Sequence, residues 1–142
     1  MRFRYREVSQ PDYSKTSLAN AVLRTASERL CIPMPRIRWF RADECGPLSF
    51  ESKARPSGFV SNPFEIWVDA DCGGRWLCFV VLHEARHVKQ RIDYPEDGLM
   101  YSAYPVGLKE CIEDTANAFA GSFLRDPEYL RIFAPFAALG GL

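Results

Sequence analysis

The residues of this chain best suited to chemistry are its only two histidines, His83 and His87, and the Glu84 that lies between them. On an α-helix, residues four apart differ by about 40° in azimuth and by one turn in height, so the two imidazoles can converge on one point. Imidazole nitrogens bind Zn²⁺ at about 2.0–2.1 Å, a distance that this convergence allows. Glu84 lies about 100° from His83 and about 60° from His87 around the helix, so it flanks such a metal without having to ligate it.

The chemistry of this arrangement is hydrolysis. Zinc lowers the pKa of a bound water to about 7, and Glu84 is placed to take a proton from that water. The pattern His-Glu-x-x-His on a helix is the HExxH arrangement of zinc peptidases. We therefore expect a zinc metallopeptidase with one Zn²⁺ per chain. His83 and His87 would be metal ligands, and Glu84 the catalytic base.

Catalytic zinc takes three protein ligands and keeps one open position, and this chain has no third histidine. The third ligand must then be a carboxylate or a thiolate. The next predicted helix offers three acidic residues: Glu110, Glu113 and Asp114. We favour Glu113, because Ala116 and Ala120 on its stripe are small enough for close approach of the two helices. Asn117, one turn further on, is expected to accept a hydrogen bond from the second ring nitrogen of a ligating histidine.

Two segments resemble the ImmA/IrrE-type metallopeptidases. The first is the strand 66–69 followed by a turn, Phe79 and the HExxH motif. The second is the run 113–124, which is similar to the family's E-x-x-A-N-x-F-A-x-x-L-L segment. The resemblance covers about residues 64–127. It implies a minimal gluzincin fold, with His83, His87 and Glu113 as zinc ligands and Glu84 as base.

The resemblance also suggests a substrate, because members of this family often act on DNA-binding repressors. No helix-turn-helix is evident in this chain, so such a regulator would be a separate protein partner. Many members have a small residue just before the second histidine, where this chain has Arg86. Arg86 is therefore a candidate contact for an acidic substrate group.

Other groups near the site are candidates for substrate contact. Three tyrosines in the segment between the two helices could donate a hydrogen bond to the oxyanion: Tyr94, Tyr101 and Tyr104. A flexible substrate segment could pair with the edge of a small sheet, and residues 64–69 are the expected edge.

Two other functions remain open at this point. Cys45, in the run 44–49, faintly resembles the cysteine ligand of peptide deformylases, which also use HExxH. That amidase function would make Cys45 the third ligand and leave the helix of Glu113 unexplained. Alternatively, the chain is a non-catalytic regulatory or interaction module of zincin fold, in which zinc is structural or absent. The presence of Glu84 argues against this module, because a structural site has no use for a base.

Periodicity predicts the elements that must position these residues. The first is an amphipathic helix with Ser14 as N-cap, and half-buried strands follow it. Next comes a helix that is buried all round in its first half, and then a loop over 93–105. A third helix and an apolar tail over 132–142, which docks on the body, complete the chain. The expected helices are 15–30, 75–91 and 106–124, and the expected strands are 36–41, 48–53 and 64–69. The fold class is therefore α+β, a small twisted sheet packed on these helices.

Length and composition agree with one domain over residues 1–142. Apolar residues make up 47% of the chain, which excludes a disordered protein, and no apolar stretch is long enough to span a membrane. Five cysteines without a CxxC pair favour free thiols and a cytoplasmic location. Charge is balanced at 18 against 18, which argues against general nucleic-acid binding. Residues 1–42 nevertheless carry nine basic and three acidic side chains, a net of +6.

Overall fold

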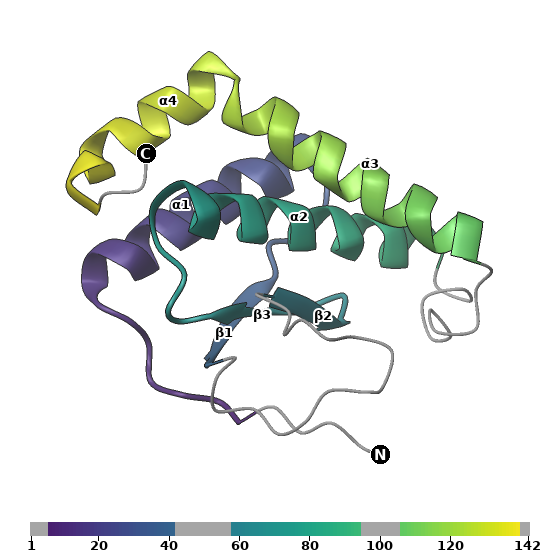
Figure 1. Ribbon diagram of the computed structural model, residues 1–142, viewed down its shortest axis with the longest axis horizontal. Helices are drawn as coiled ribbons and strands as arrows, with labels where there is room; N and C mark the ends of the chain where they lie inside the picture. The colour runs from purple at the N-terminus through teal and green to yellow at the C-terminus, as the bar shows by residue number, and fades with distance from the viewer. Residues whose placement is uncertain (1–5, 42–57, 95–105, 140–142) are drawn as a thin grey trace.

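The computed structural model describes residues 6–41, 58–94 and 106–139, and over these the chain is α+β (Figure 1). The elements in order are α1 (Tyr13–Leu30), β1 (Arg36–Phe40), β2 (Gly58–Asn62), β3 (Glu65–Asp69), α2 (Gly74–Asp93), α3 (Val106–Leu124), α4 (Pro127–Phe133) and a 3₁₀ segment (Ala134–Leu139). The expected α+β class and the three expected helices are confirmed. The strand expected over 48–53 and most of the loop expected over 93–105 lie outside the described residues.

Helix α2 is the centre of the fold. It packs against α1 and α3 and also contacts β2 and β3, so it lies between the helical layer and the sheet (Figure 1). Leu77, Val81 and Ala85 are fully buried, but Trp76 is 53% exposed. The expectation of all-round burial over the first half of this helix is therefore wrong. A run of seven apolar residues covers nearly two turns, so its side chains point in all directions around the helix. Those on a side with no packed neighbour are exposed to solvent.

Helix α1 begins one residue after Asp12, and not at the expected N-cap Ser14, which lies inside the helix. The Asp12 carboxylate accepts a hydrogen bond from the backbone N–H of Lys15 at 3.0 Å. Aspartate caps as well as serine does, so the earlier residue starts the helix two positions sooner. Most of the apolar stripe expected on this helix is buried, and its last member, Leu30, is half-buried against the core. The buried members are Leu18, Ala19, Val22, Leu23 and Ala26.

The sheet has the strand order β1-β3-β2, with β1 parallel and β2 antiparallel to β3. Strand β3 is therefore central and cannot accept an added strand, so the expectation that residues 64–69 form a sheet edge is wrong. Among the described strands, the outer strand next to α2 is instead β2, which the sequence reasoning did not predict. Ile66 and Val68 face the main core, while Trp67 is buried on the other face, where it stacks on Phe59.

Strand β2 lies close to α2 because its first residue is a glycine. A Cβ at Gly58 would lie 2.7 Å from Val80 Cγ1, 3.0 Å from the Trp67 carbonyl oxygen and 3.1 Å from Glu84 Cγ. These distances are shorter than ordinary van der Waals contacts, and one of the neighbours is backbone. The absence of a side chain at Gly58 thus sets the distance between the sheet edge and the residue that the sequence proposes as base.

We expect Gly58→Ala to destabilise the protein by about 1–3 kcal/mol, the usual cost of adding a methyl group to a filled site. The matched control is Gly121→Ala in α3, where a Cβ would meet only the flexible end of Arg125, at 3.6 Å. Because alanine favours helix by about 1 kcal/mol over glycine, this control should be neutral or stabilising. Chemical denaturation of both variants checks the prediction. Equal stability of the two variants would contradict the close approach at Gly58.

The C-terminal part closes over α1. Asp126 caps α4, accepting the backbone N–H of Glu128 at 2.8 Å, and Arg29 of α1 pairs with Asp126 and Glu128. Phe133, in the tail expected to dock on the body, is buried, as is Tyr129 before it.

None of the helices in the described segments combines the length and the apolar character needed to cross a membrane.

Candidate metal centre

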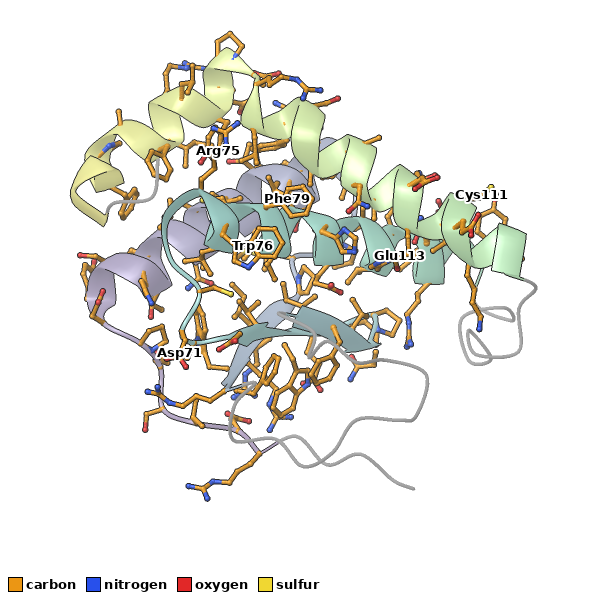
Figure 2. All side chains as sticks on the ribbon, viewed as in Figure 1. Asp71, Arg75, Trp76, Phe79, Cys111 and Glu113 are labelled. Atoms are coloured by element: carbon orange, nitrogen blue, oxygen red, sulfur yellow. The ribbon has the colours of Figure 1, made fainter. Side chains whose placement is uncertain are left out.

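Helices α2 and α3 run antiparallel (Figure 1), and the two histidines of α2 meet Glu113 of α3, which Figure 2 labels. His83 Nε2 lies 3.0 Å from His87 Nε2 and 3.2 Å from Glu113 Oε2, and His87 Nε2 lies 3.0 Å from Glu113 Oε1. Ligand atoms at 2.0–2.1 Å from a tetrahedral ion are about 3.3–3.4 Å apart. The three side chains therefore need to open by only a few tenths of an ångström to surround a zinc-sized ion.

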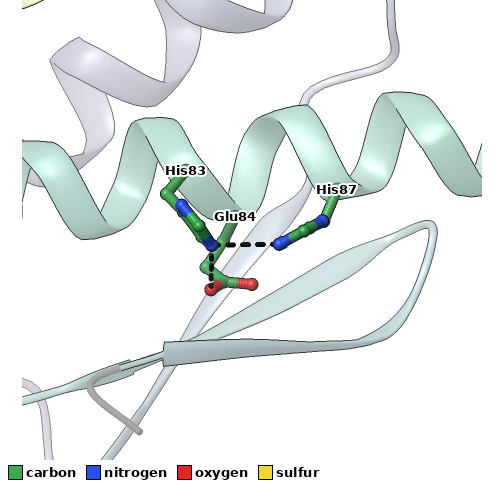
Figure 3. Close-up of side chains that lie close together, drawn as sticks. All are labelled: His83, Glu84 and His87. Atoms are coloured by element: carbon green, nitrogen blue, oxygen red, sulfur yellow. Dashed lines mark hydrogen bonds and ion pairs between the residues drawn. The ribbon is translucent and has the colours of Figure 1, made fainter. Parts of the chain in front are cut away.

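Glu84 belongs to the same cluster but stands further off. His83, Glu84 and His87 form a group that could hold a metal ion. However, the Glu84 carboxylate is 4.0 Å from His83 Nε2, against 3.0–3.2 Å for Glu113. Figure 3 shows both imidazoles on one side of α2, with the Glu84 carboxylate close to them. Of the two carboxylates, Glu113 therefore lies nearer to the imidazole nitrogens, and Glu84 lies further from them.

Burial differs sharply between the two carboxylates. The Glu84 side chain is 8% exposed and lies between α2 and β2, whereas the Glu113 side chain is 42% exposed. Both imidazoles are mostly covered. The centre is therefore open to solvent on the side of Glu113 and closed on the side of the sheet.

The two carboxylates also differ in pKa. Burial raises the pKa of Glu84, although the neighbouring His87 and His83 act in the opposite direction. Hydrogen bonds from His83 and His87 hold the pKa of Glu113 far below its usual value. Glu113 is thus an anion throughout the neutral range, as a ligand must be. The pKa of Glu84 is above that of an exposed glutamate, because burial disfavours its charged form. A bound cation would favour the charged form of Glu84.

The remaining nitrogen of His87 is held by a residue that the sequence reasoning missed. His87 Nδ1 lies 2.7 Å from Gln90 Oε1, and Gln90 Nε2 donates to the Ile112 carbonyl of α3 at 3.2 Å. Asn117, expected in this role, is exposed on α3. The Nδ1 of His83 is buried and has no hydrogen-bond partner among the described residues. The expectation for Asn117 therefore fails, because the i+3 position on the helix of His87 is already occupied by an amide.

An aromatic stack extends the centre along α2 (Figure 2). Trp76 stacks on Phe79 with ring centroids 5.3 Å apart, and Phe79 stacks on His83 at 6.0 Å. The positions 76, 79 and 83 share one helix face, so the spacing could have revealed this stack in the sequence. The stack holds the ring of His83 from one side.

The other sequence candidates that the structure describes are not brought to the centre. Tyr94 is the C-cap of α2 and is 60% exposed; it lies seven residues beyond His87, about 10 Å along the helix axis. Arg86 is half-buried on α2, and Glu110 and Asp114 are exposed on α3. Three candidates lie outside the described residues: Cys45, Tyr101 and Tyr104.

Removal of the Glu113 charge should separate the two candidate third ligands. We expect Glu113→Gln to weaken metal retention strongly, because a neutral amide replaces the anion that lies 3.0–3.2 Å from both imidazoles. Cys45→Ser should leave retention unchanged. The check is metal content after dialysis against a weak chelator. Loss of metal from Cys45→Ser and not from Glu113→Gln would support the deformylase-like centre instead.

The centre combines side chains from two helices. Two imidazoles on one helix and a carboxylate from the next converge on one point, with a buried second carboxylate beside them. Ala116 and Ala120, fully buried where α3 passes α2, allow the approach that brings Glu113 in. No protein-family model, curated protein or solved structure matches this chain.

Proposed function

We propose that this protein is a zinc-dependent metalloendopeptidase that hydrolyses a peptide bond in a protein partner. The observation that carries the proposal is the Glu113 carboxylate, 3.0–3.2 Å from the Nε2 atoms of both histidines. It completes a set of two histidines and one carboxylate, which is the ligand set of one class of catalytic zinc sites. The buried Glu84 beside this set supports an enzyme over a structural site.

A zinc ion held by His83, His87 and Glu113 would polarise the scissile carbonyl and lower the pKa of water to about 7. Glu84 takes a proton from the attacking water and returns it to the leaving amine. Its buried carboxylate, beside the position of the metal, can hold the proton between the two steps.

The edge strand β2 is the proposed docking site for the substrate backbone. Among the described strands, β2 neighbours β3 and stands at the end of the order β1-β3-β2. It also passes next to the base, because Gly58 would place a Cβ 3.1 Å from Glu84 Cγ. An extended segment added to β2 would have main-chain hydrogen bonds and a carbonyl near Glu84. A flexible or unfolded segment of the partner meets this requirement, whereas a folded helix does not.

The gluzincin fold and the ImmA/IrrE-type family are part of the same proposal. They are supported by the HExxH helix α2, the glutamate helix α3 and the small mixed sheet. The resemblance to this family further suggests a separate DNA-binding regulator as substrate. The test is to incubate wild type and Glu84→Gln with a native cell extract and sequence the new N-termini. Cleavage seen only with wild type supports the proposal.

A further inference from the structure

We propose that Gln90 is a positioning residue of the metal centre. It sets the tautomer of His87 and links α3 to α2 by a hydrogen bond. The inference rests on the proposed metal centre but not on hydrolysis. Gln90 lies one turn beyond His87 on α2, and its amide contacts both the ligand and the neighbouring helix.

The direction of each hydrogen bond follows from the groups available. The Ile112 carbonyl is only an acceptor, so the amide of Gln90 must turn its N–H₂ toward that oxygen, at 3.2 Å. The amide oxygen then faces His87 Nδ1, at 2.7 Å. An amide oxygen is only an acceptor too, so Nδ1 must carry the proton. His87 therefore presents an unprotonated Nε2 in its neutral form, which is the form that binds a metal.

The same amide controls the third ligand. Ile112 immediately precedes Glu113, and the hydrogen bond to its carbonyl fixes the height and rotation of α3 against α2 at that point. A helical carbonyl has two lone pairs, so it can accept this bond in addition to the one within the helix. Gln90 thus sets the orientation of one ligand and the approach of another. His83 Nδ1 has no comparable partner within the described segments, so Gln90 orients only the imidazole of His87.

Two substitutions separate the two contacts. Gln90→Leu keeps the helix and removes both hydrogen bonds. Gln90→Glu keeps an acceptor for His87 Nδ1–H but has no donor for the Ile112 carbonyl. Partners of this kind typically change metal affinity about 10–100-fold. We expect Gln90→Leu to lose affinity within this range, and Gln90→Glu to recover part of the loss through its acceptor.

The matched control is Asn117→Ala on α3. Asn117 is exposed one turn beyond Glu113, and its replacement should leave zinc affinity within about two-fold of wild type. Affinity is measured by competition with a chromophoric chelator. Thermal unfolding of the metal-free proteins is measured beside it, so that a general loss of stability is recognised.

The outcomes divide clearly. A loss in Gln90→Leu, partial recovery in Gln90→Glu and no change in Asn117→Ala support the proposal. Unchanged zinc affinity in Gln90→Leu overturns it, even if the metal-free protein is less stable, because the role of Gln90 is then structural. No recovery in Gln90→Glu overturns the tautomer role. If wild type binds no zinc, the metal centre, the proposed function and the role of Gln90 fail together. That result is distinct from the two Gln90 outcomes, in which wild type still binds zinc.

Discussion

Alanine at His83 or at His87 should abolish zinc binding in a protein that otherwise holds about one zinc ion per chain. The two Nε2 atoms lie 3.0 Å apart and both face Glu113, so each substitution removes one of three converging ligands. With two ligands left, the centre cannot hold the ion through dialysis. The measurement is metal content by mass spectrometry on proteins purified without added zinc.

The matched control for these variants is Arg86→Ala, on the same helix between the two histidines. Arg86 is half-buried and is not among the residues that converge on the centre, so its loss should leave zinc occupancy unchanged. Far-UV circular dichroism establishes that all three variants keep their helices. Full occupancy in both histidine variants would refute the metal centre. Loss in Arg86→Ala as well would show that occupancy follows the stability of α2 and not the ligands.

The second large effect is on catalysis. Glu84→Gln should keep the fold and the zinc but lower hydrolysis by about 10²–10⁴-fold, the usual contribution of general acid–base assistance. Glutamine is nearly isosteric, so the contact with β2 near Gly58 is preserved. It cannot take a proton from the attacking water or return one to the leaving amine. Because Glu84 lies 4.0 Å from His83 Nε2 and is not the nearest carboxylate, zinc content should not change.

Glu110→Gln provides the matched control, since it makes the same change at an exposed acid on α3. Cleavage of proteins in a native extract by this variant should equal that by wild type. Identical cleavage patterns from wild type and Glu84→Gln would refute the role of Glu84. If neither cuts any protein while both bind one partner equally, the chain is an interaction module of zincin fold. In that case zinc content remains the test of whether the metal is structural.

Much of the centre could be predicted from the sequence because its first part is local. The spacing of His83, Glu84 and His87 along one helix already determines that two imidazoles share a face with a carboxylate beside them. The apolar stripe of α1 and the alternation of Ile37 and Trp39 in β1 are local patterns of the same kind. Even the choice of Glu113 followed a short-range feature, the small residues Ala116 and Ala120 on its own helix.

Other parts depend on contacts between segments that are far apart in the chain. Residues 64–69 alternate as a strand, but only pairing with both β1 and β2 makes β3 central and moves the edge to β2. Local pattern did not reveal β2, since Gly58 has low strand propensity and is explained only by the helix packed against it. Trp76 belongs to an apolar run, and its exposure depends on which neighbours surround α2.

The orientation of the ligands was likewise decided by the tertiary structure. Nothing in the run around Gln90 shows that its amide meets the Ile112 carbonyl, 22 residues later, while it also accepts from His87. Asn117 had the right chemistry and the right spacing from Glu113, yet it faces solvent. The sequence by itself determined the residue types and the helix face of this centre, because both follow from the 3.6-residue turn. The third ligand's approach, the partner of His87 and the edge beside Glu84 were decided by how α2, α3 and β2 pack, which depends on side-chain volumes summed over all three elements.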